Sequence, residues 1–137
     1  MKYSISSYNR LNIHGMLEIR VIDNRNIPIS NALVSISKII YTGIYNESAE
    51  GIVIEELYTD NNGIIKTELP VLNELMGSTN FYSANIVKEG YYSSYIFYIQ
   101  IYPNINSLYE VYLTPRIEGE ERFRFFFQPK RRTVHEH

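Results

Sequence analysis

No cysteine occurs in this sequence, and this excludes disulfide frameworks, thiolate metal sites and thiol nucleophiles. Tryptophan is also absent, and alanine occurs only three times. Scarce Ala and Leu disfavour a helical bundle. No apolar run approaches the roughly 18 residues that a membrane helix needs, so we expect no membrane partner. The first fifteen residues lack a basic segment followed by an apolar one, so we expect cytoplasmic synthesis without a signal peptide.

The residues that do occur favour extended structure. The chain holds 13 Tyr and 6 Phe together with many Ile, and these side chains suit pleated, half-buried surfaces. A length of 137 residues fits one domain with a single hydrophobic core that needs no metal or disulfide. Composition and length therefore predict one all-β domain.

Alternation of apolar and polar residues marks the individual strands. Leu17, Ile19 and Val21 alternate with more polar neighbours, and the same period recurs along the chain. We expect seven strands, at residues 17–22, 32–37, 52–58, 64–68, 82–87, 95–102 and 109–113, with 95–102 in a central position. Seven short strands at this spacing predict a Greek-key β-sandwich.

Turn residues separate these segments. Asp60–Gly63 combines side chains that bond their own backbone with a glycine that tolerates positive φ, so it predicts a tight turn. Lys88–Gly90 predicts a second turn. The polar stretch 39–51 loses the strand period and is interpreted as a flexible loop, and 71–80 as a connection that holds one helical turn at 73–76.

The C-terminal segment differs from the rest in charge. Residues 1–115 carry a formal charge of −4 and residues 116–137 a charge of +2. Between Arg122 and Arg132 five cations face no acid in the sequence, and Phe alternates with Arg at the start of this stretch. We therefore divide the chain into a leader (1–14), a sandwich (15–115) and a basic, aromatic arm (116–137).

Several motifs, taken in order, resemble a known family. Gly15–Val21, Pro28–Val34, Thr59–Gly63 and Gly90–Tyr92 resemble carboxypeptidase regulatory-like (transthyretin-like) domains. With Leu69-Pro70, Ile99–Pro103 and Leu113–Pro115 added, the set is similar to the domain that precedes the catalytic region in spore cortex-lytic proteins of clostridia. The resemblance covers residues 15–115 and implies a prealbumin-like sandwich with a non-catalytic role at the spore. No peptidoglycan-processing region follows in this sequence, so we carry over no lytic activity.

Catalytic and metal-binding residues are not predicted. A nucleophilic triad needs a histidine held by packed structure, but His14, His135 and His137 lie near the two ends of the chain. Glu55 and Glu56 are adjacent on a strand and therefore point to opposite faces, so they cannot flank one bond. We expect no enzyme activity, no cofactor and no metal site.

Two groups of residues are candidates for binding. The first is the tyrosine cluster at Tyr91, Tyr92 and Tyr95, extended by Tyr98 and Tyr102; tyrosines of one strand parity would fill the core, and exposed ones would stack on sugar rings or on partner side chains. The second is the arm, with Arg122, Phe123, Arg124, Phe125 and Phe127. It can dock on its own sandwich or on a partner subunit by adding to a sheet edge, stay disordered, or contact a polyanion.

These features predict a binding or structural module, and the resemblance implies that it is spore-associated, in cortex or coat assembly. The expected partners are another protein or a second copy, with peptidoglycan or another spore-envelope polymer as a further candidate; nucleic acid is disfavoured because the whole chain is acidic. The alternative is an adaptor or regulator, like a detached prodomain, of a spore cortex-lytic enzyme.

Overall fold

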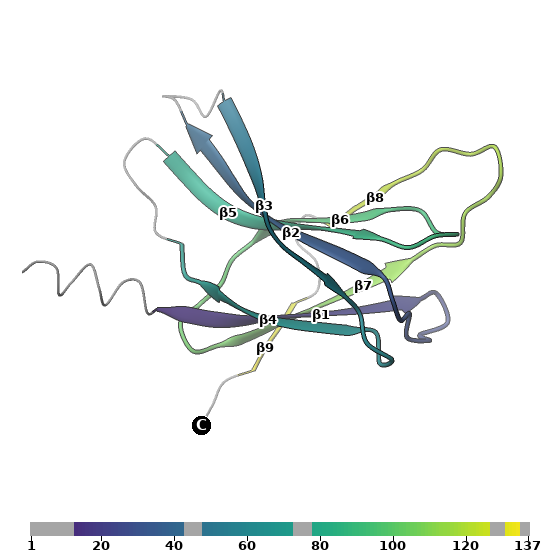
Figure 1. Cartoon of the computed structure of the whole chain (residues 1–137), viewed down its shortest axis with the longest axis horizontal. Coiled ribbons are helices and arrows are strands. Elements are labelled where there is room, and N and C mark those ends of the chain that lie inside the picture. The colour runs from purple at the N-terminus through teal and green to yellow at the C-terminus, as the bar shows by residue number, and fades with distance from the viewer. Residues whose placement is uncertain (1–12, 43–47, 73–77, 127–130, 135–137) are drawn as a thin grey trace, which may run out of the picture.

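Two β-sheets face each other in the computed structural model of this chain (Figure 1), which describes residues 13–42, 48–72, 78–126 and 131–134. Within these residues nine strands form, in the order β1(His14–Asp23), β2(Leu33–Thr42), β3(Ser48–Tyr58), β4(Ile64–Pro70), β5(Ser78–Val87), β6(Ser94–Ile99), β7(Asn106–Leu113), β8(Arg124–Phe126) and β9(Arg131–Val134). One sheet has the order β4-β1-β7-β9 and the other the order β3-β2-β5-β6-β8.

Strands β1 to β7 make the sandwich, three in one sheet and four in the other, which confirms the predicted seven-stranded all-β fold. β1 pairs antiparallel with β4 and parallel with β7, so the first and last strands of the sandwich lie side by side. In β1 the apolar residues of the alternating pattern are the buried ones. Leu17, Ile19 and Val21 are fully buried, while Glu18 and Arg20 between them are partly exposed.

The core lies between the two inner faces. The first sheet contributes Leu17, Ile19 and Val111, and the second contributes Val34, Ile36, Ile86, Ile96 and Ile99, all fully buried. Burying one such side chain contributes about 1.5–3 kcal/mol. The core therefore extends over both sheets without any disulfide or other cross-link.

Side-chain capping explains two of the turns. In the turn before β4, Asp60 Oδ1 accepts hydrogen bonds from the Asn62 and Ile64 amides at 2.9 and 3.0 Å. After β1, Asp23 Oδ1 accepts from the Arg25 and Ile27 amides at 2.7 and 3.0 Å. The hydrogen bond from the Ile27 amide lowers the pKa of Asp23 below its usual value. Both turns occur where the sequence placed Asp and Asn, as the local chemistry requires.

The interpretation of residues 39–51 as a loop is wrong for most of that stretch. Residues 39–42 continue β2 and residues 48–51 begin β3, and the two segments pair with each other in register. Residues 43–47 lie outside the described residues, as does the helical turn expected at 73–76. The alternation of apolar and polar residues is lost at 39–42 and 48–51 because the ends of β2, β3 and β5 extend away from the opposite sheet (Figure 1). These ends therefore have no inner face that requires apolar residues.

Strand β6 also differs from the prediction, which gave it residues 95–102 and a central position. It ends at Ile99 and is an edge strand of its sheet in the seven-stranded body, next to β5. A register shift opposite Tyr82 and Ala84 inserts one extra residue, and Tyr98 takes a φ of 63°. The bulge lets Ile96 and Ile99 both face the core while Tyr98 is 51% exposed, so no tyrosine of this strand fills the core.

The arm adds one short strand to each sheet. β8 pairs parallel with β6, and β9 pairs antiparallel with β7. Both strands lie on the same side of the sandwich, where β6 and β7 would otherwise present unpaired edges. Within the described ranges the structure holds no helix with the length and hydropathy of a membrane span.

We predict that Gly63→Ala costs much more stability than Gly90→Ala. Both glycines have positive φ, 74° and 90°, so each substitution carries about 1–2 kcal/mol of backbone strain. At Gly63 the added Cβ would also come within 2.4 Å of the Val21 carbonyl oxygen, whereas at Gly90 nothing lies within 4 Å. Urea unfolding of both variants measures the difference; equal losses would contradict the close approach of this turn to β1.

We also predict a tyrosine-specific loss of stability at alkaline pH. The Tyr82 hydroxyl donates to the Pro70 carbonyl at 2.6 Å, and burial raises the pKa of Tyr82 to about 12. An unfolded tyrosine ionises near pH 10, so this group's contribution is complete below pH 10 and is lost as the pH rises to about 12. Between these pH values the free energy of unfolding falls by up to about 1.4 kcal/mol per pH unit. In the Tyr82→Phe variant the free energy of unfolding should depend less on pH between pH 10 and about 12. An unchanged pH dependence would contradict the role assigned to Tyr82.

Candidate binding site

The loop after β5 and the first residues of the arm run side by side. The Tyr92 amide donates to the Thr114 carbonyl at 3.0 Å, and the Arg116 amide donates to the Gly90 carbonyl at 2.8 Å. Tyr91 forms an isolated bridge with Pro115. Because Pro115 has no amide hydrogen to continue the β7 ladder, the chain leaves the sheet here and crosses to the loop.

Tyr92 holds the start of the arm in place. Its ring is 3% exposed, its hydroxyl accepts from the Ile117 amide at 2.9 Å, and it donates to the Ile117 carbonyl at 3.2 Å. The guanidinium carbons of Arg116 and Arg122 lie 5.6 and 5.7 Å from the ring centroid. Both distances are within the range for cation–π attraction. One aromatic side chain thus contacts the arm at three positions.

Two cations of the arm, Arg116 and Arg122, are compensated locally. Arg122 Nη2 lies 2.7 Å from Glu120 Oε1, and Arg116 Nη2 lies 3.8 Å from Glu121 Oε2. All four side chains are substantially exposed, so each pair contributes little to stability. The pairs do reduce the positive potential, and this weakens the polyanion alternative for the part of the arm before β8.

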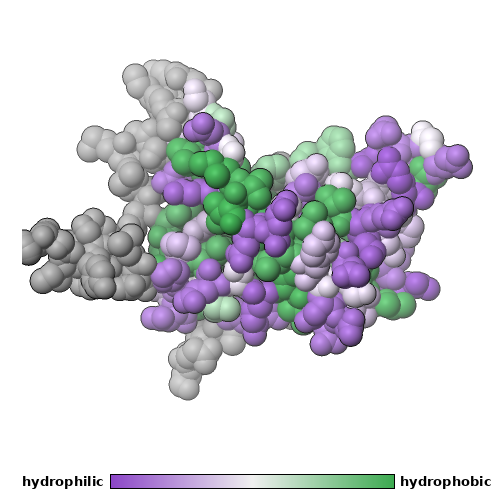
Figure 2. Space-filling view, in the orientation of Figure 1, coloured by the Kyte–Doolittle hydropathy of each residue, from purple (hydrophilic) through white to green (hydrophobic). Residues whose placement is uncertain are grey.

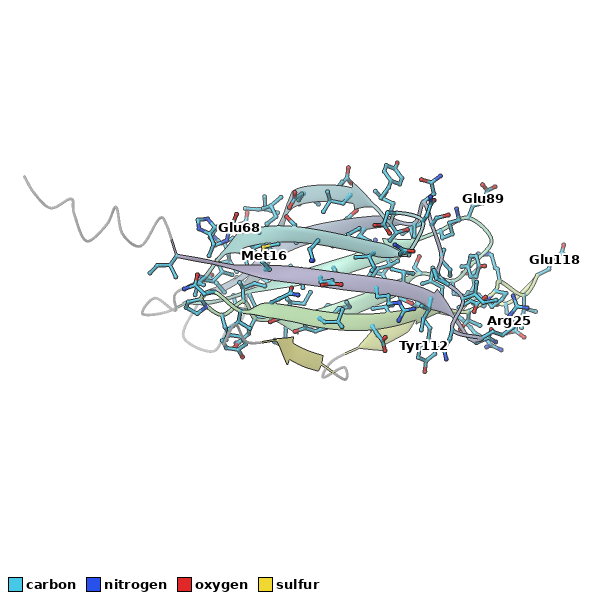
Figure 3. All side chains as sticks on the ribbon, turned by 90° about the horizontal axis from the view of Figure 1, so that it is seen from below. Met16, Arg25, Glu68, Glu89, Tyr112 and Glu118 are labelled. Carbon is cyan, nitrogen blue, oxygen red and sulfur yellow. The ribbon has the colours of Figure 1, made fainter. Side chains whose placement is uncertain are left out.

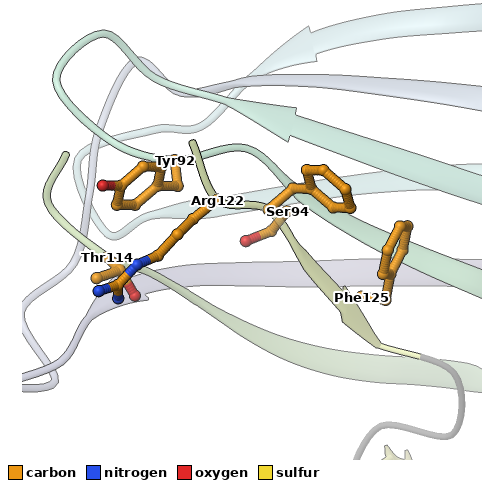
Figure 4. A pocket seen from close by; sticks show the side chains of 6 residues that line it. Tyr92, Ser94, Thr114, Arg122 and Phe125 are labelled. Carbon is orange, nitrogen blue, oxygen red and sulfur yellow. The ribbon is translucent and has the colours of Figure 1, made fainter. Parts of the chain in front are cut away.

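A cavity of about 360 Å³ opens beside Tyr92, below the arm (Figure 4). Its lining combines aromatic rings, three hydroxyls and one guanidinium, from Tyr92, Ser94, Thr114, Arg122, Phe123 and Phe125. This volume is at the lower end of the range of small-ligand pockets. The combination suits a ligand or partner side chain with an apolar body and a hydrogen-bonding end.

Aromatic packing fixes β8 on the outer side of this cavity. The Phe125 ring lies 5.6 Å from the Tyr95 ring and 5.5 Å from the Phe97 ring, between centroids. Phe123 packs edge-on against Phe125 at 5.1 Å but stays 64% exposed. Phe125 therefore docks on the outer face of the sheet, and Phe123 presents most of its surface to solvent.

The structure brings four of the residues proposed for binding to this one cavity, namely Tyr92, Arg122, Phe123 and Phe125. Tyr95 lies on the outer face, and Tyr91 packs partly buried against the core. Arg124 is placed in β8 by its backbone, and Phe127 lies outside the described residues. Sequence reasoning missed Ser94, the first residue of β6, and Thr114, the residue after β7, because lone hydroxyl residues carry no distinctive signal.

Among the described residues, few ionisable groups line the cavity. Its ionisable lining residues are Arg122 and Tyr92, which offer no carboxylate or imidazole to accept a proton from a reacting group. Glu55 and Glu56 lie elsewhere and point apart, as predicted: Glu55 accepts from Thr67 and Glu56 from Ser35. His14 is the first residue of β1 rather than part of the leader, and His135 and His137 lie outside the described residues. No group of three or more His, Cys, Asp or Glu among the described residues is placed to hold a metal ion.

Comparison with known proteins gives similarity of structure only. No family model and no curated protein matches this chain. The fold is similar to 3-chlorocatechol 1,2-dioxygenase from Rhodococcus opacus 1CP (13% identity, TM-score 0.48, covering 76% of this chain and 61% of that one). It is also similar to hydroxyquinol 1,2-dioxygenase from Pseudomonas putida DLL-E4 (11%, 0.49, 76% and 57%) and to wild-type catechol 1,2-dioxygenase from Acinetobacter radioresistens (14%, 0.47, 91% and 60%). This chain thus spans about three fifths of each protein's length, and at these scores we draw nothing about its function from them.

We predict that Tyr92→Phe loosens the arm without unfolding the sandwich. The change removes both hydrogen bonds to Ile117 but keeps the buried ring and the two guanidinium contacts. A loss of about 1–2 kcal/mol in local stability should speed hydrogen exchange of the Ile117 amide by roughly tenfold. Tyr112→Phe, on the opposite sheet, serves as the control. Unchanged exchange at Ile117 in Tyr92→Phe would show that the hydroxyl does not hold the arm.

Proposed function

We propose that this protein is a non-catalytic binding or structural module of the carboxypeptidase regulatory-like type, associated with the spore in cortex or coat assembly. The observation that carries the proposal is the docking of the Arg/Phe arm, which adds strands to β6 and β7 and frames a cavity lined by rings, hydroxyls and one guanidinium. This arrangement provides contact area and hydrogen-bond donors, which are the means of binding.

The arm supports partner binding by leaving recognition groups accessible. Phe123 is 64% exposed at the mouth of the cavity, and the Arg122 side chain is 52% exposed beside it. Aromatic and arginine side chains in this situation are the residues that most often dominate binding energy at interfaces. The arm thus acts as a preformed contact segment on a rigid sandwich.

The opposite side of the sandwich supports protein contacts as well. β3 is the last strand of its sheet in the described part of the chain, and Ile52, Val53 and Ile54 on it are 49%, 57% and 42% exposed. An apolar patch lies over β3 in the space-filling view (Figure 2). A long strand edge with exposed branched side chains is suited to pairing with another chain. A protein partner or a second copy is therefore the expected occupant.

The spore setting rests on the resemblance of residues 15–115 to the domain that precedes the catalytic region of spore cortex-lytic proteins. The same resemblance supports the alternative proposal, an adaptor or regulator of such an enzyme. The two proposals differ in the partner. A scaffold binds coat or cortex proteins or itself, whereas an adaptor binds a hydrolase.

We predict that the arm is required for partner capture from a lysate of sporulating cells. Full-length protein, a variant ending at Pro115 and the double variant Arg122→Ser/Phe123→Ser are each immobilised, and captured proteins are quantified by mass spectrometry. Loss of the two exposed contacts should reduce capture at least tenfold, and the Tyr112→Ser control should not. A hydrolase among the arm-dependent partners would favour the adaptor, and coat proteins or the chain itself would favour the scaffold. Undiminished capture by the variant that ends at Pro115 would overturn the role of the arm.

A further inference from the structure

The two outer faces of the sandwich differ in chemistry. On the outer face of the β4-β1-β7 sheet, seen in Figure 3, charged side chains pair with each other: Arg20 with Glu110 at 3.3 Å, and Glu18 with Lys66 at 3.9 Å. The Asn106 amide also donates to Glu18 at 3.1 Å. A face whose charges are paired and partly exposed is a solvated surface.

The outer face of the five-stranded sheet has a floor of small neutral polar side chains. Ser35 and Ser37 on β2 lie directly opposite Asn85 and Ser83 on β5. Their neighbours Val34, Ile36, Ala84 and Ile86 are buried, so alternation turns these four toward the outside. We call Ser35, Ser37, Ser83 and Asn85 the polar floor. Because these side chains are short, the floor is low relative to what surrounds it.

Aromatic rings border the polar floor along β6 and β8. Tyr95 lies directly opposite Asn85, and Phe125 directly opposite Tyr95. The Tyr95 and Phe97 rings are stacked, with an angle of 13° between their planes and 6.3 Å between their centroids. Together with Phe125 these rings form a ridge that we call the aromatic ridge, and each of its three members keeps part of its surface exposed.

The other borders of the polar floor are a carboxylate, a hollow and a group of aromatic rings. On the β3 side, Glu56 lies opposite Ser35 and accepts its hydroxyl hydrogen at 3.3 Å. At one end of the floor a hollow of about 490 Å³ is lined by Asn31, Leu33, Tyr58, Val87, Lys88 and Glu89. At the other end the Phe81 ring contacts Tyr41 and Tyr98, with centroids 5.5 and 4.4 Å apart.

One polar atom of the floor lacks a partner. Asn85 Oδ1 is buried from solvent and has no hydrogen-bond donor among the described residues. A buried acceptor without a hydrogen-bond donor carries a cost in free energy. A ligand whose hydroxyl or amide hydrogen reaches this oxygen recovers that cost, provided that the side chain turns toward it.

We propose that the polar floor and the aromatic ridge bind a neutral glycan chain of pyranose rings. Sugar rings present apolar C–H faces, which stack on aromatic rings, and hydroxyls, which pair with Ser, Asn and Glu side chains. One row of paired residues crosses five adjacent strands, namely Glu56, Ser35, Asn85, Tyr95 and Phe125. The row spans about 19 Å at the usual strand spacing, so it can contact several sugar rings. Its single charge is a carboxylate, which disfavours nucleic acid and other polyanions.

This inference goes beyond the proposed function, because it assigns a ligand class to a face of the sheet that shares only Phe125 with the lining of the partner cavity. The cavity opens beside Tyr92 and Arg122, whereas the polar floor lies on β2 and β5. Binding of a purified sugar can therefore succeed or fail independently of partner capture from a lysate.

The test is isothermal titration of the full chain with chitohexaose and with cellohexaose. Binding of either sugar supports the proposal, and stronger binding of chitohexaose would indicate that Asn85 accepts from an acetamido group. Tyr95→Ala should weaken binding at least tenfold, since it removes the ring next to the floor. The matched control Tyr112→Ala, a tyrosine on the opposite outer face (Figure 3), should leave binding unchanged.

A second variant keeps the test valid if Tyr95→Ala releases the arm. Ser83→Lys places a long charged side chain on the floor and removes no ring contact, so the fold should be retained, as far-ultraviolet circular dichroism can check. It should reduce sugar affinity at least tenfold. The proposal is overturned if neither sugar binds at millimolar concentration, or if a folded Ser83→Lys variant binds as tightly as the unchanged protein.

Discussion

Contact between the inner faces of two sheets is the interaction on which the rest of this structure depends. Ile36, Ile86 and Ile96 from one sheet meet Leu17, Ile19 and Val111 from the other, and all six are fully buried. The chain has no disulfide that would hold the sheets together, so this apolar burial sets their separation and orientation. The outer faces and edges, where binding is proposed, are positioned by this packing of the inner faces.

The arm pairs with the exposed sheet edges on one side of the sandwich, and the edge on the other side stays unpaired within the described residues. β8 and β9 cover β6 and β7, so two sheet edges that would otherwise be exposed are paired by one continuous segment. On the other side Thr67 donates to Glu55 between β4 and β3 at 2.6 Å, which joins the sheets through side chains and leaves the backbone edge of β3 unpaired within the described residues. The asymmetry separates a closed side, with the cavity, from an open side suited to strand pairing.

The same asymmetry distinguishes the two outer faces. Charges gather on the β4-β1-β7 face and pair there, while the five-stranded face carries serines, an asparagine and aromatic rings. Charged pairs hold water and resist docking, whereas a face made mainly of rings and hydroxyls loses less hydration when a ligand covers it. The function proposed for this protein therefore concerns the five-stranded sheet and the arm attached to it.

The sequence by itself determined most of the seven sandwich strands, the inward residues of strands such as β1, and the turns, because alternation and Asp/Asn/Gly chemistry are local. Leu17, Ile19 and Val21 could be assigned to the core, and Asp60–Gly63 to a turn, without any knowledge of their partners. The tertiary structure alone decided that residues 39–42 and 48–51 pair, that a bulge at Tyr98 turns Ile96 and Ile99 to the same face, and that Ser94 and Thr114 join Tyr92 in one cavity. These features depend on which strands become neighbours, and strand pairing joins residues far apart in the chain, so local sequence patterns do not encode it.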